Sequence, residues 1–467
     1  DNWIWPRHTG DFSMFRVYAS KDNRPAAYSP QNVPYRPKKH FSISTKGVKE
    51  GDFTMIYGFP GNTQEYILSD AVAYIAERSD PAKIAIRTGR LDIITKAQES
   101  DPALRIHYAA KHASIANAWK KWQGEALGID RRGTVAAKFD YETQFGLWSV
   151  GRPEYAGVVM GLRAEYDRIM DAYFAYEITR ETLSTLPAAY TPEERAEECF
   201  ARRKSAEQAL WRHAFREYGR CPKVYRTPSY AEGMARYKSP EAYADALFEA
   251  VWEGSDSVAM QPAVRLREET KRMLDHISWM LGTKSLRNLN SKILNELYTT
   301  YIKGLREWDR ERAFYPDANL TLRVAYGSVA GYEYADGEYH KPQTTLDGII
   351  AKDNPEIYDY DIPQSLRDLY ASKNYGRWGT VIDGRRTVSV CFLATNHTTG
   401  GNSGSPVLNA GGELIGINFD RTWRSTMSDI AYDPAICRNI AVDIRYVLFV
   451  VDRVGGAGYL LKEMTLK

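Results

Sequence analysis

The stretch TNHTTGGNSGSPVLNAGGELIGINFDRTW, residues 395–423, decides how the rest of the chain is interpreted. Glycines at 401 and 404 flank Ser403, so the backbone can make a tight turn that exposes the serine hydroxyl. A nucleophilic serine also needs backbone N–H groups that converge where the oxyanion of a tetrahedral intermediate forms. The turn NAGG and the alternating segment ELIGINFD follow, which predicts a hairpin. The stretch therefore predicts a nucleophile on a tight turn, with a plain Gly/Ser loop as the alternative.

Length and composition limit the classes of protein that the chain can belong to. Its 467 residues, 43% of them hydrophobic, suffice for two or three domains with cores. The 62 basic and 59 acidic side chains leave a net charge of +3, which gives no indication of nucleic acid or an acidic membrane as partner. No apolar run of about 18 residues is present, so no membrane span is predicted. Four scattered cysteines form no CxxC pair and leave the redox compartment open.

Hydrophobic periodicity divides the chain into three segments. Residues 1–63 have the pattern of strands and turns, residues 64–319 have mainly helical spacing, and residues 320–467 return to a period of two. In the last segment we predict strands that include residues 387–396 and 445–454. A chain that leaves a sheet and returns to it predicts an α+β fold, with one β domain that carries a large helical insertion.

Three polar residues in the middle segment are predicted to begin helices. Ser69 precedes DAVAYIAE, Thr191 opens a capping box with Pro192 at the first helical position, and Ser239 precedes Pro-Glu. Each would accept a hydrogen bond from a backbone N–H of its first helical turn.

The turn GNSGSP resembles the Gly-Asp-Ser-Gly-Gly-Pro turn of chymotrypsin-like serine peptidases. This resemblance implies that Ser403 is the nucleophile and that the amides of Gly401 and Ser403 form the oxyanion hole. A serine of this kind also needs a histidine and a carboxylate. The candidate carboxylate is Asp11, in WPRHTGDFSMF, where a preceding glycine and a following apolar segment suit a half-buried acid. A turn aspartate is the alternative for Asp11.

The histidine of the triad is the missing part. In chymotrypsin-like folds, which consist of two β-barrels, the order along the chain is histidine, aspartate, serine. The histidine should therefore precede Asp11, in the first of the two barrels. His8 and His397 are near the two candidates in sequence, but neither fits this order, and we expect His397 to be a loop residue near the site. We therefore expect this chain to be the C-terminal part of a longer enzyme and to be inactive by itself.

Three long motifs together resemble the bacterial dipeptidyl-peptidase 7/11 family of serine peptidases, most closely its Asp/Glu-specific members. They are DNWIWPRHTGDFSMFRVYA at 1–19, YGFPGNTQEY at 57–66 and the nucleophile stretch at 395–420. The resemblance implies a chymotrypsin-like double β-barrel, here the second barrel and parts of the first, with a helical lid. It also implies a serine exopeptidase that releases N-terminal dipeptides, without a cofactor, in the periplasm and as a homodimer.

The same resemblance implies how the free N-terminus of a peptide substrate is bound. Asn2 and the backbone of Trp3 would lie at the substrate ammonium, and Asp420 would supply a negative charge. Asn117, in the helical segment, would reach this ammonium from the lid. From spacing alone, Asn117 reads as a solvated helix residue and Asp420 as a turn former.

Arg421 follows Asp420 at the end of the strand after the nucleophile. Family members that select Asp or Glu at the residue before the cut (P1) carry arginine at this position, and those that accept apolar residues carry glycine. A guanidinium matches a carboxylate through two parallel hydrogen bonds, which supports discrimination of roughly 10²-fold or more. The alternatives are an apolar P1 preference, with Arg421 pointing elsewhere, and a peptide-binding module without catalysis. His107 and His112 are five residues apart and no HExxH is present, so no metal site is predicted.

Overall fold

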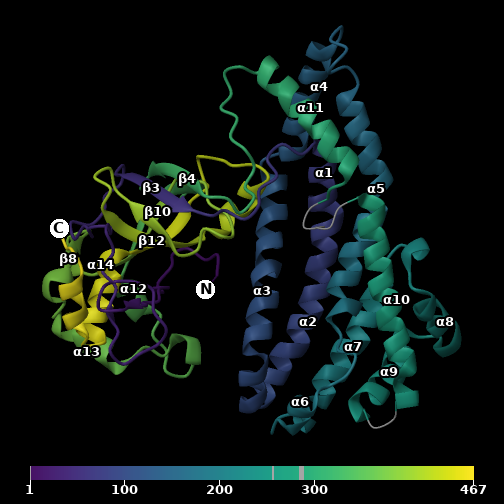
Figure 1. The fold of residues 1–467 in the computed structure, drawn as a ribbon, viewed down its shortest axis with the longest axis horizontal. Helices are drawn as coiled ribbons and strands as arrows, with labels where there is room; N and C mark the ends of the chain where they lie inside the picture. Colours follow the sequence, from purple (N-terminus) through teal and green to yellow (C-terminus); the bar gives the residue numbers. More distant parts are fainter. Residues whose placement is uncertain (1, 255–256, 283–288) are drawn as a thin grey trace. The chain divides into compact units, whose positions relative to one another are not determined.

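The structure is a computed structural model that describes residues 2–254, 257–282 and 289–467 (Figure 1). These residues form two compact units. The β unit combines Asp1–Glu65 with Asp317–Lys467, and the helical unit is Tyr66–Pro316. The boundaries placed from the sequence, after residues 63 and 319, fall close to these.

The β unit is built around a curled sheet of seven antiparallel strands in the order β4-β3-β11-β12-β13-β10-β7. These strands are β3 (Phe53–Gly58), β4 (Arg323–Ser328), β7 (Gln343–Thr345), β10 (Ser389–Ala394), β11 (Ser405–Leu408), β12 (Leu414–Arg421) and β13 (Asn439–Asp443). Beyond β4, Val329 forms an antiparallel bridge with Ala394, and the amide of Thr395 donates to the carbonyl of Ser328 at 2.9 Å. The sheet therefore curls until its first strand meets β10.

The curl gives the sheet an inner and an outer face, each with its own core. The inner core is a small cluster of buried side chains, namely Val48, Ile56, Val329, Phe392, Val407, Ile415 and Ala441. The outer core includes side chains of three short helices: α12 (Leu346–Ala351), α13 (Gln364–Ser372) and α14 (Ile444–Phe449). Two small hairpins complete the unit: β5 (Tyr332–Ala335) with β6 (Glu338–His340), and β8 (Thr380–Ile382) with β9 (Arg385–Thr387).

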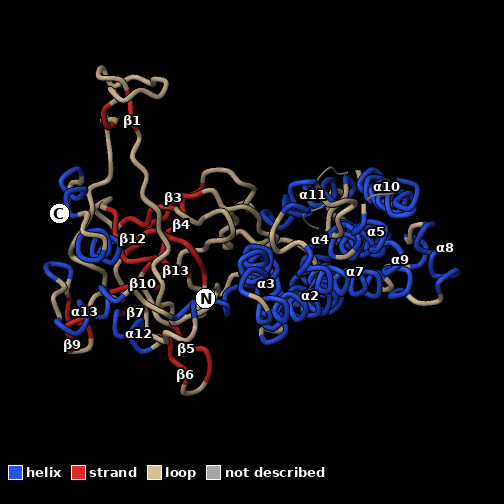
Figure 2. Tube along the Cα trace, turned by 90° about the horizontal axis from the view of Figure 1, so that it is seen from below, coloured by secondary structure: helices blue, strands red, loops and turns tan. Residues whose placement is uncertain are grey.

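A long arm extends from the β unit between residues 11 and 41 (Figure 2). Its only strands are β1 (Tyr18–Ala19) and β2 (Val33–Pro34), which pair with each other. The alternation in residues 11–19 predicts a longer strand, but a strand needs a partner strand beside it. Among the described residues no strand pairs with residues 11–17, and the side chains of Phe15 and Tyr28 are 93% and 94% exposed. The prediction therefore holds for two residues only.

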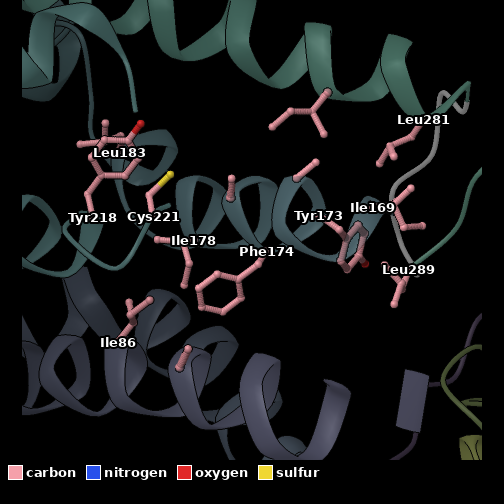
Figure 3. Close-up of a cluster of buried hydrophobic side chains, with 14 of the residues drawn as sticks. Ile86, Ile169, Tyr173, Phe174, Ile178, Leu183, Tyr218, Cys221, Leu281 and Leu289 are labelled. Atoms are coloured by element: carbon pink, nitrogen blue, oxygen red, sulfur yellow. The ribbon is translucent and has the colours of Figure 1, made fainter. Parts of the chain in front are cut away.

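The helical unit contains eleven α-helices within the described residues. They are α1 (Ser69–Ala73), α2 (Asp80–Ser100), α3 (Pro102–Arg131), α4 (Thr134–Ser149), α5 (Val158–Glu181), α6 (Pro192–Ala196), α7 (Lys204–Tyr218), α8 (Pro228–Tyr237), α9 (Pro240–Glu253), α10 (Ser257–Leu281) and α11 (Lys292–Trp308). Helix α5 runs through the main core, where Ile169, Tyr173, Phe174 and Ile178 lie among side chains of neighbouring helices (Figure 3). The aromatic side chains of this unit therefore serve its packing.

Two of the three predicted helix starts are confirmed. Thr191 caps α6 in a reciprocal capping box with Glu194, and the Ser239 hydroxyl accepts from the amide of Ala242 at the start of α9. The prediction for Ser69 is wrong by one residue. Leu68 precedes α1, while the amide and hydroxyl of Ser69 both donate to the buried carboxylate of Glu142.

The predicted strand over residues 445–454 is also wrong. These residues form α14 and the π-helical turn Val450–Val454. Residues 445–449 are all buried and, apart from Arg445, apolar, and such a short run does not distinguish a helix from a strand by its periodicity. The signal for the helix is Asp443, whose carboxylate accepts from the amide of Arg445 and so caps α14.

Among the described residues, no helix is both long and apolar enough to cross a membrane.

Candidate active site

Ser403 is exposed in the turn between β10 and β11, and two buried asparagines hold this turn. The side-chain oxygen of Asn402 accepts from the amide of Thr399 at 3.0 Å. The backbone carbonyl of Asn402 accepts from the side-chain amide of Asn418 at 3.2 Å. The carbonyl of Asn418 in turn accepts from the amide of Gly404 at 2.7 Å. These hydrogen bonds therefore fix the turn to β12, while the side chain of Ser403 is exposed.

Two amides of this turn are available to an acceptor. Gly401 has φ +108°, a conformation that favours glycine, and an added Cβ there would clash with the carbonyl of Phe59. No described residue accepts a hydrogen bond from the amide of Gly401 or Ser403, whereas the amide between them donates to Thr399 at 3.1 Å. The N–H groups of a serine and of the glycine two residues before it have the composition of an oxyanion hole.

The serine hydroxyl is directed to β12 rather than to an imidazole. Ser403 Oγ donates to the carbonyl of Phe419 at 3.2 Å, and no histidine of the described residues hydrogen-bonds to it. The register of β12 against β13 shifts between Asn418 and Asp420, so a bulge lies at Phe419. Bulges re-aim side chains, and this one comes directly before Asp420 and Arg421.

His397 lies near this turn but is committed to other partners. Its Nδ1 is 3.2 Å from the carboxylate of Glu65, and its Nε2 is 3.0 Å from the carbonyl of Ser428. Burial, and then the charge of Arg421, lower the pKa of His397 below its usual value. These contacts make it a loop residue that ties two segments together, as expected from the sequence.

Asp11 is exposed, which corrects the expectation of a half-buried acid. The residues before it are fixed to the sheet, because Cys391 Sγ lies 3.4 Å from the carbonyl of Thr9. A Cβ on Gly10 would clash with the ring of Tyr446, so close packing requires glycine there. The carboxylate is thus held at the start of the arm, with its side chain in solvent.

Trp3 and Asp420 are brought together, and Arg7 joins them. The amide of Trp3 donates to Asp420 Oδ2 at 2.8 Å, and the carbonyl of Trp3 accepts from the amide of Trp423 at 2.6 Å. The buried guanidinium of Arg7 forms an ion pair with the same carboxylate oxygen. Sequence reasoning missed Arg7, although it lies within a quoted motif. Asn2 is exposed beside Trp3.

Arg421 is buried in a second ion pair. Its Nη1 and Nη2 donate to the two carboxylate oxygens of Asp429 at 2.6 and 2.8 Å, with side chains 4% and 12% exposed. Nη1 also donates to Ser428 Oγ at 2.8 Å and to the carbonyl of Thr398 at 3.3 Å. One face of the guanidinium lies over the ring of Trp3, 5.5 Å from its centroid. Arg421 is therefore a buried member of the site, and not a surface arginine.

Asn117 lies on α3 in the helical unit and is half-buried. The remaining predicted site residues all belong to the β unit. The structure thus groups Trp3, Asp420 and Arg421, and it assigns Asn117 to the other unit.

One group of possible metal ligands occurs among the described residues, in the helical unit. Ligand atoms of His107, Glu197 and Cys199 lie within 4.8 Å of one another. The guanidinium of Arg203 already occupies this group, 2.7 Å from His107 Nε2 and 3.2 Å from Glu197. Because a cation would be repelled there, we assign no metal to it.

Comparison with known proteins identifies the family of this chain. The sequence model described as peptidase S46 matches residues 1–191 and 191–466. The chain belongs to the peptidase S46 family. An Asp/Glu-specific dipeptidyl-peptidase of Capnocytophaga gingivalis is 41% identical over 512 residues, which cover 100% of this chain and 70% of that protein. A dipeptidyl-peptidase 7 of Phocaeicola vulgatus is 33% identical, with the same shares covered.

Solved structures of S46 peptidases agree with this assignment. The crystal structure of Porphyromonas endodontalis DPP11 in complex with the dipeptide Arg-Glu matches with a TM-score of 0.83 at 32% identity. The match covers 100% of this chain and 72% of that one. This S46 chain therefore shares its fold with a dipeptide-binding relative, as an α+β protein with a curled antiparallel sheet.

Proposed function

We propose that the protein is a serine-type dipeptidyl-peptidase that releases N-terminal dipeptides and prefers Asp or Glu at P1. Membership of the S46 family and the names of its relatives support a peptidase of this type. Porphyromonas endodontalis DPP11, which has been solved with Arg-Glu and with Arg-Asp, supports the acidic preference. The observation that carries the proposal is the buried Arg421, at the end of the second strand after an exposed serine on a turn with two available amides.

In this proposal Ser403 attacks the carbonyl carbon after the second residue of the substrate. The serine proton passes to a histidine and then to the leaving amine, while the amides of Gly401 and Ser403 bind the oxyanion. Asp11 orients that histidine. His397 is not this base in the structure, because both of its ring nitrogens already contact Glu65 and Ser428.

The substrate ammonium would bind near Trp3 and Asp420, with Asn2 beside them. The charge of Asp420 is offset by Arg7, so the ammonium would join an existing ion pair and not an isolated carboxylate. A group of alternating charges suits a dipolar substrate end. It also explains why a blocked N-terminus, which lacks the positive charge, should be rejected.

The P1 carboxylate would meet Arg421 at the end of β12. A charge-assisted contact of this kind is stronger than a neutral hydrogen bond, and discrimination of about 10²-fold is a reasonable expectation. The apolar alternative remains a second candidate for one reason: Asp429 already offsets the charge of Arg421.

We further propose that the curled sheet is the second barrel of a chymotrypsin-like double barrel, and that the enzyme is a periplasmic homodimer. The closure of β4 onto β10 supports the barrel. The arm supports an interface, because exposed aromatic side chains such as Phe15 and Tyr28 are characteristic of contact surfaces.

The proposal is tested with the full-length protein and dipeptidyl reporters that end in Asp, Glu or Leu. We expect kcat/KM to be about 100-fold higher for the acidic reporters, and no cleavage of an N-acetylated one. Ser403→Ala should lose at least about 10³-fold in kcat and all labelling by a serine-directed phosphonate. Equal cleavage of the Asp and Leu reporters would refute the acidic preference. If the phosphonate does not label the full-length protein, a peptide-binding module without catalysis would be favoured.

A further inference from the structure

We propose that Asp429 is a positioning residue for acidic specificity: it fixes the guanidinium of Arg421 in the orientation that the P1 carboxylate requires. This inference rests on the function proposed above and adds a residue that the sequence did not indicate. Asp429 follows Arg421 by eight residues, at the end of the 3-10 helix Trp423–Asp429.

The contacts of Arg421 define one orientation of its planar group. Both carboxylate oxygens of Asp429 accept from it, one from Nη1 and one from Nη2, in the bidentate geometry that gives directional specificity. The hydroxyl of the adjacent Ser428 and the carbonyl of Thr398, which lies in another segment, accept from the same Nη1. A long side chain with several rotatable bonds is thereby reduced to a single arrangement before any substrate binds.

Contacts from two other segments of the chain hold Asp429 and its neighbour Ser428 in place. The backbone carbonyl of Asp429 accepts from the amide of Gln64 at 2.6 Å, next to Glu65, which contacts His397. His397 in turn contacts the carbonyl of Ser428, the residue before Asp429. The positioning residue is therefore fixed to the loop before the helical unit and to the loop that leads to Ser403.

The charges explain why a carboxylate is used at this position. Arg421 is 4% exposed, and a buried guanidinium without a negative partner would be strongly destabilised. Asp429 supplies that partner in the empty site, while Trp3 covers one face of the guanidinium. Arg421 can then remain buried and ordered between catalytic cycles, instead of turning out to solvent.

The test is the pair of reporters ending in Asp and Leu, applied to Asp429→Asn in the full-length enzyme. Asn keeps the size of the side chain but removes one of the two acceptors and the charge. We expect KM for the Asp reporter to rise about tenfold, with kcat changed less than about twofold and both constants for the Leu reporter unchanged. Asp429→Glu, which keeps the carboxylate, should recover part of the loss.

Two controls separate positioning from general damage. Ser428→Ala removes one neutral acceptor and should raise KM for the Asp reporter by only about twofold to threefold. Asp443→Asn removes the bidentate partner of another buried arginine, Arg445, outside the site. It should lower stability without changing the ratio of the two KM values.

Three outcomes would overturn the inference. An equal change for both reporters would indicate a structural role alone, and no change would indicate no role. A lower KM for the Asp reporter would indicate that Asp429 competes with the substrate. If the unmodified enzyme shows no preference for Asp over Leu, the proposed function fails first, and that result is distinguishable because it needs no variant.

Discussion

The amide of Trp3 donates a hydrogen bond of 2.8 Å to the carboxylate of Asp420, across 417 positions of the chain. Arg7 forms an ion pair with the same oxygen, and its guanidinium lies over the ring of Phe419. The first residues of the chain therefore lie beside the turn that carries Ser403, because the carbonyl of Phe419 accepts from Ser403 Oγ.

Arg7→Gln should destabilise the β unit. Removing one partner of a buried ion pair leaves the carboxylate of Asp420 without its cation, which costs about 3–5 kcal/mol. Urea unfolding at pH 7 measures this change in free energy. Arg16→Gln, which breaks a more exposed pair with Glu463, is the matched control and should cost much less. Equal losses for the two variants would contradict the assignment of Arg7 to the site.

Gly401→Ala should reduce kcat by at least about 10²-fold, because the new Cβ would push the turn away from Phe59 and displace an oxyanion donor. KM for the Asp reporter should change little. Gly400→Ala is the control, since an added Cβ there meets nothing within 4 Å and φ is not in the left-handed region. A similar loss of kcat in both variants would argue against a specific role of the Gly401 amide.

Arg421→Gly should lose turnover of the Asp reporter and gain some turnover of the Leu reporter. The structure adds a second effect, since Asp429 would then be buried without its guanidinium partner. We therefore expect the single variant to lose about 3 kcal/mol of stability or more, and the double variant Arg421→Gly/Asp429→Asn to recover most of it. Unfolding curves and kcat/KM ratios of the three proteins check both effects. An unchanged preference for the Asp reporter in the single variant would contradict the proposed role of Arg421.

His8 should make the β unit less stable in acid. Burial, and then the charge of Lys352, lower the pKa of His8 to about 4, whereas an unfolded histidine titrates near 6.5. Between these values the unfolded chain binds a proton that the folded chain does not, so stability falls as the pH falls from about 6.5 to about 4. Below about 4 this contribution no longer changes with pH.

The measurement is the urea midpoint at pH 7 and pH 4.5 for the unmodified protein and for His8→Gln. Glutamine does not titrate, so the midpoint of the variant should shift less between the two pH values. Equal shifts would mean that other groups, including the buried His213 and the half-buried His397, account for the whole acid effect.

Local signals in the sequence were sufficient for some elements. The capping box at Thr191 and the cap at Ser239 depend only on neighbours within one turn, and both form as predicted. The hairpin after Ser403 depends on the NAGG turn and on alternation, and β11 pairs with β12 around it. These features are set by interactions that a short window of sequence contains.

Features that depend on distant partners could not be predicted. The alternation near Phe15 is typical of a strand, but no neighbouring strand covers it. The run at 445–454 is helical, although its buried residues 445–449 show no periodicity that separates a helix from a strand. The ion pairs of Arg7 and Arg421 follow no sequence spacing from which they could be predicted. The partner of Arg7 is 413 positions away, and the partner of Arg421 is set by the path of the 3-10 helix that follows β12.

Asp317 joins the two points where the chain leaves and rejoins the β unit. Its carboxylate accepts from Thr63 Oγ1 at 2.6 Å and from the amide of Glu65 at 2.9 Å, while Thr63 Oγ1 accepts from the amide of Ala318 at 2.8 Å. The roughly 250 intervening residues thus form a modular cassette, and these hydrogen bonds hold its two ends together. A protein engineer could exchange this cassette for a short glycine-rich linker, or for the cassette of another family member, without altering the order of the strands.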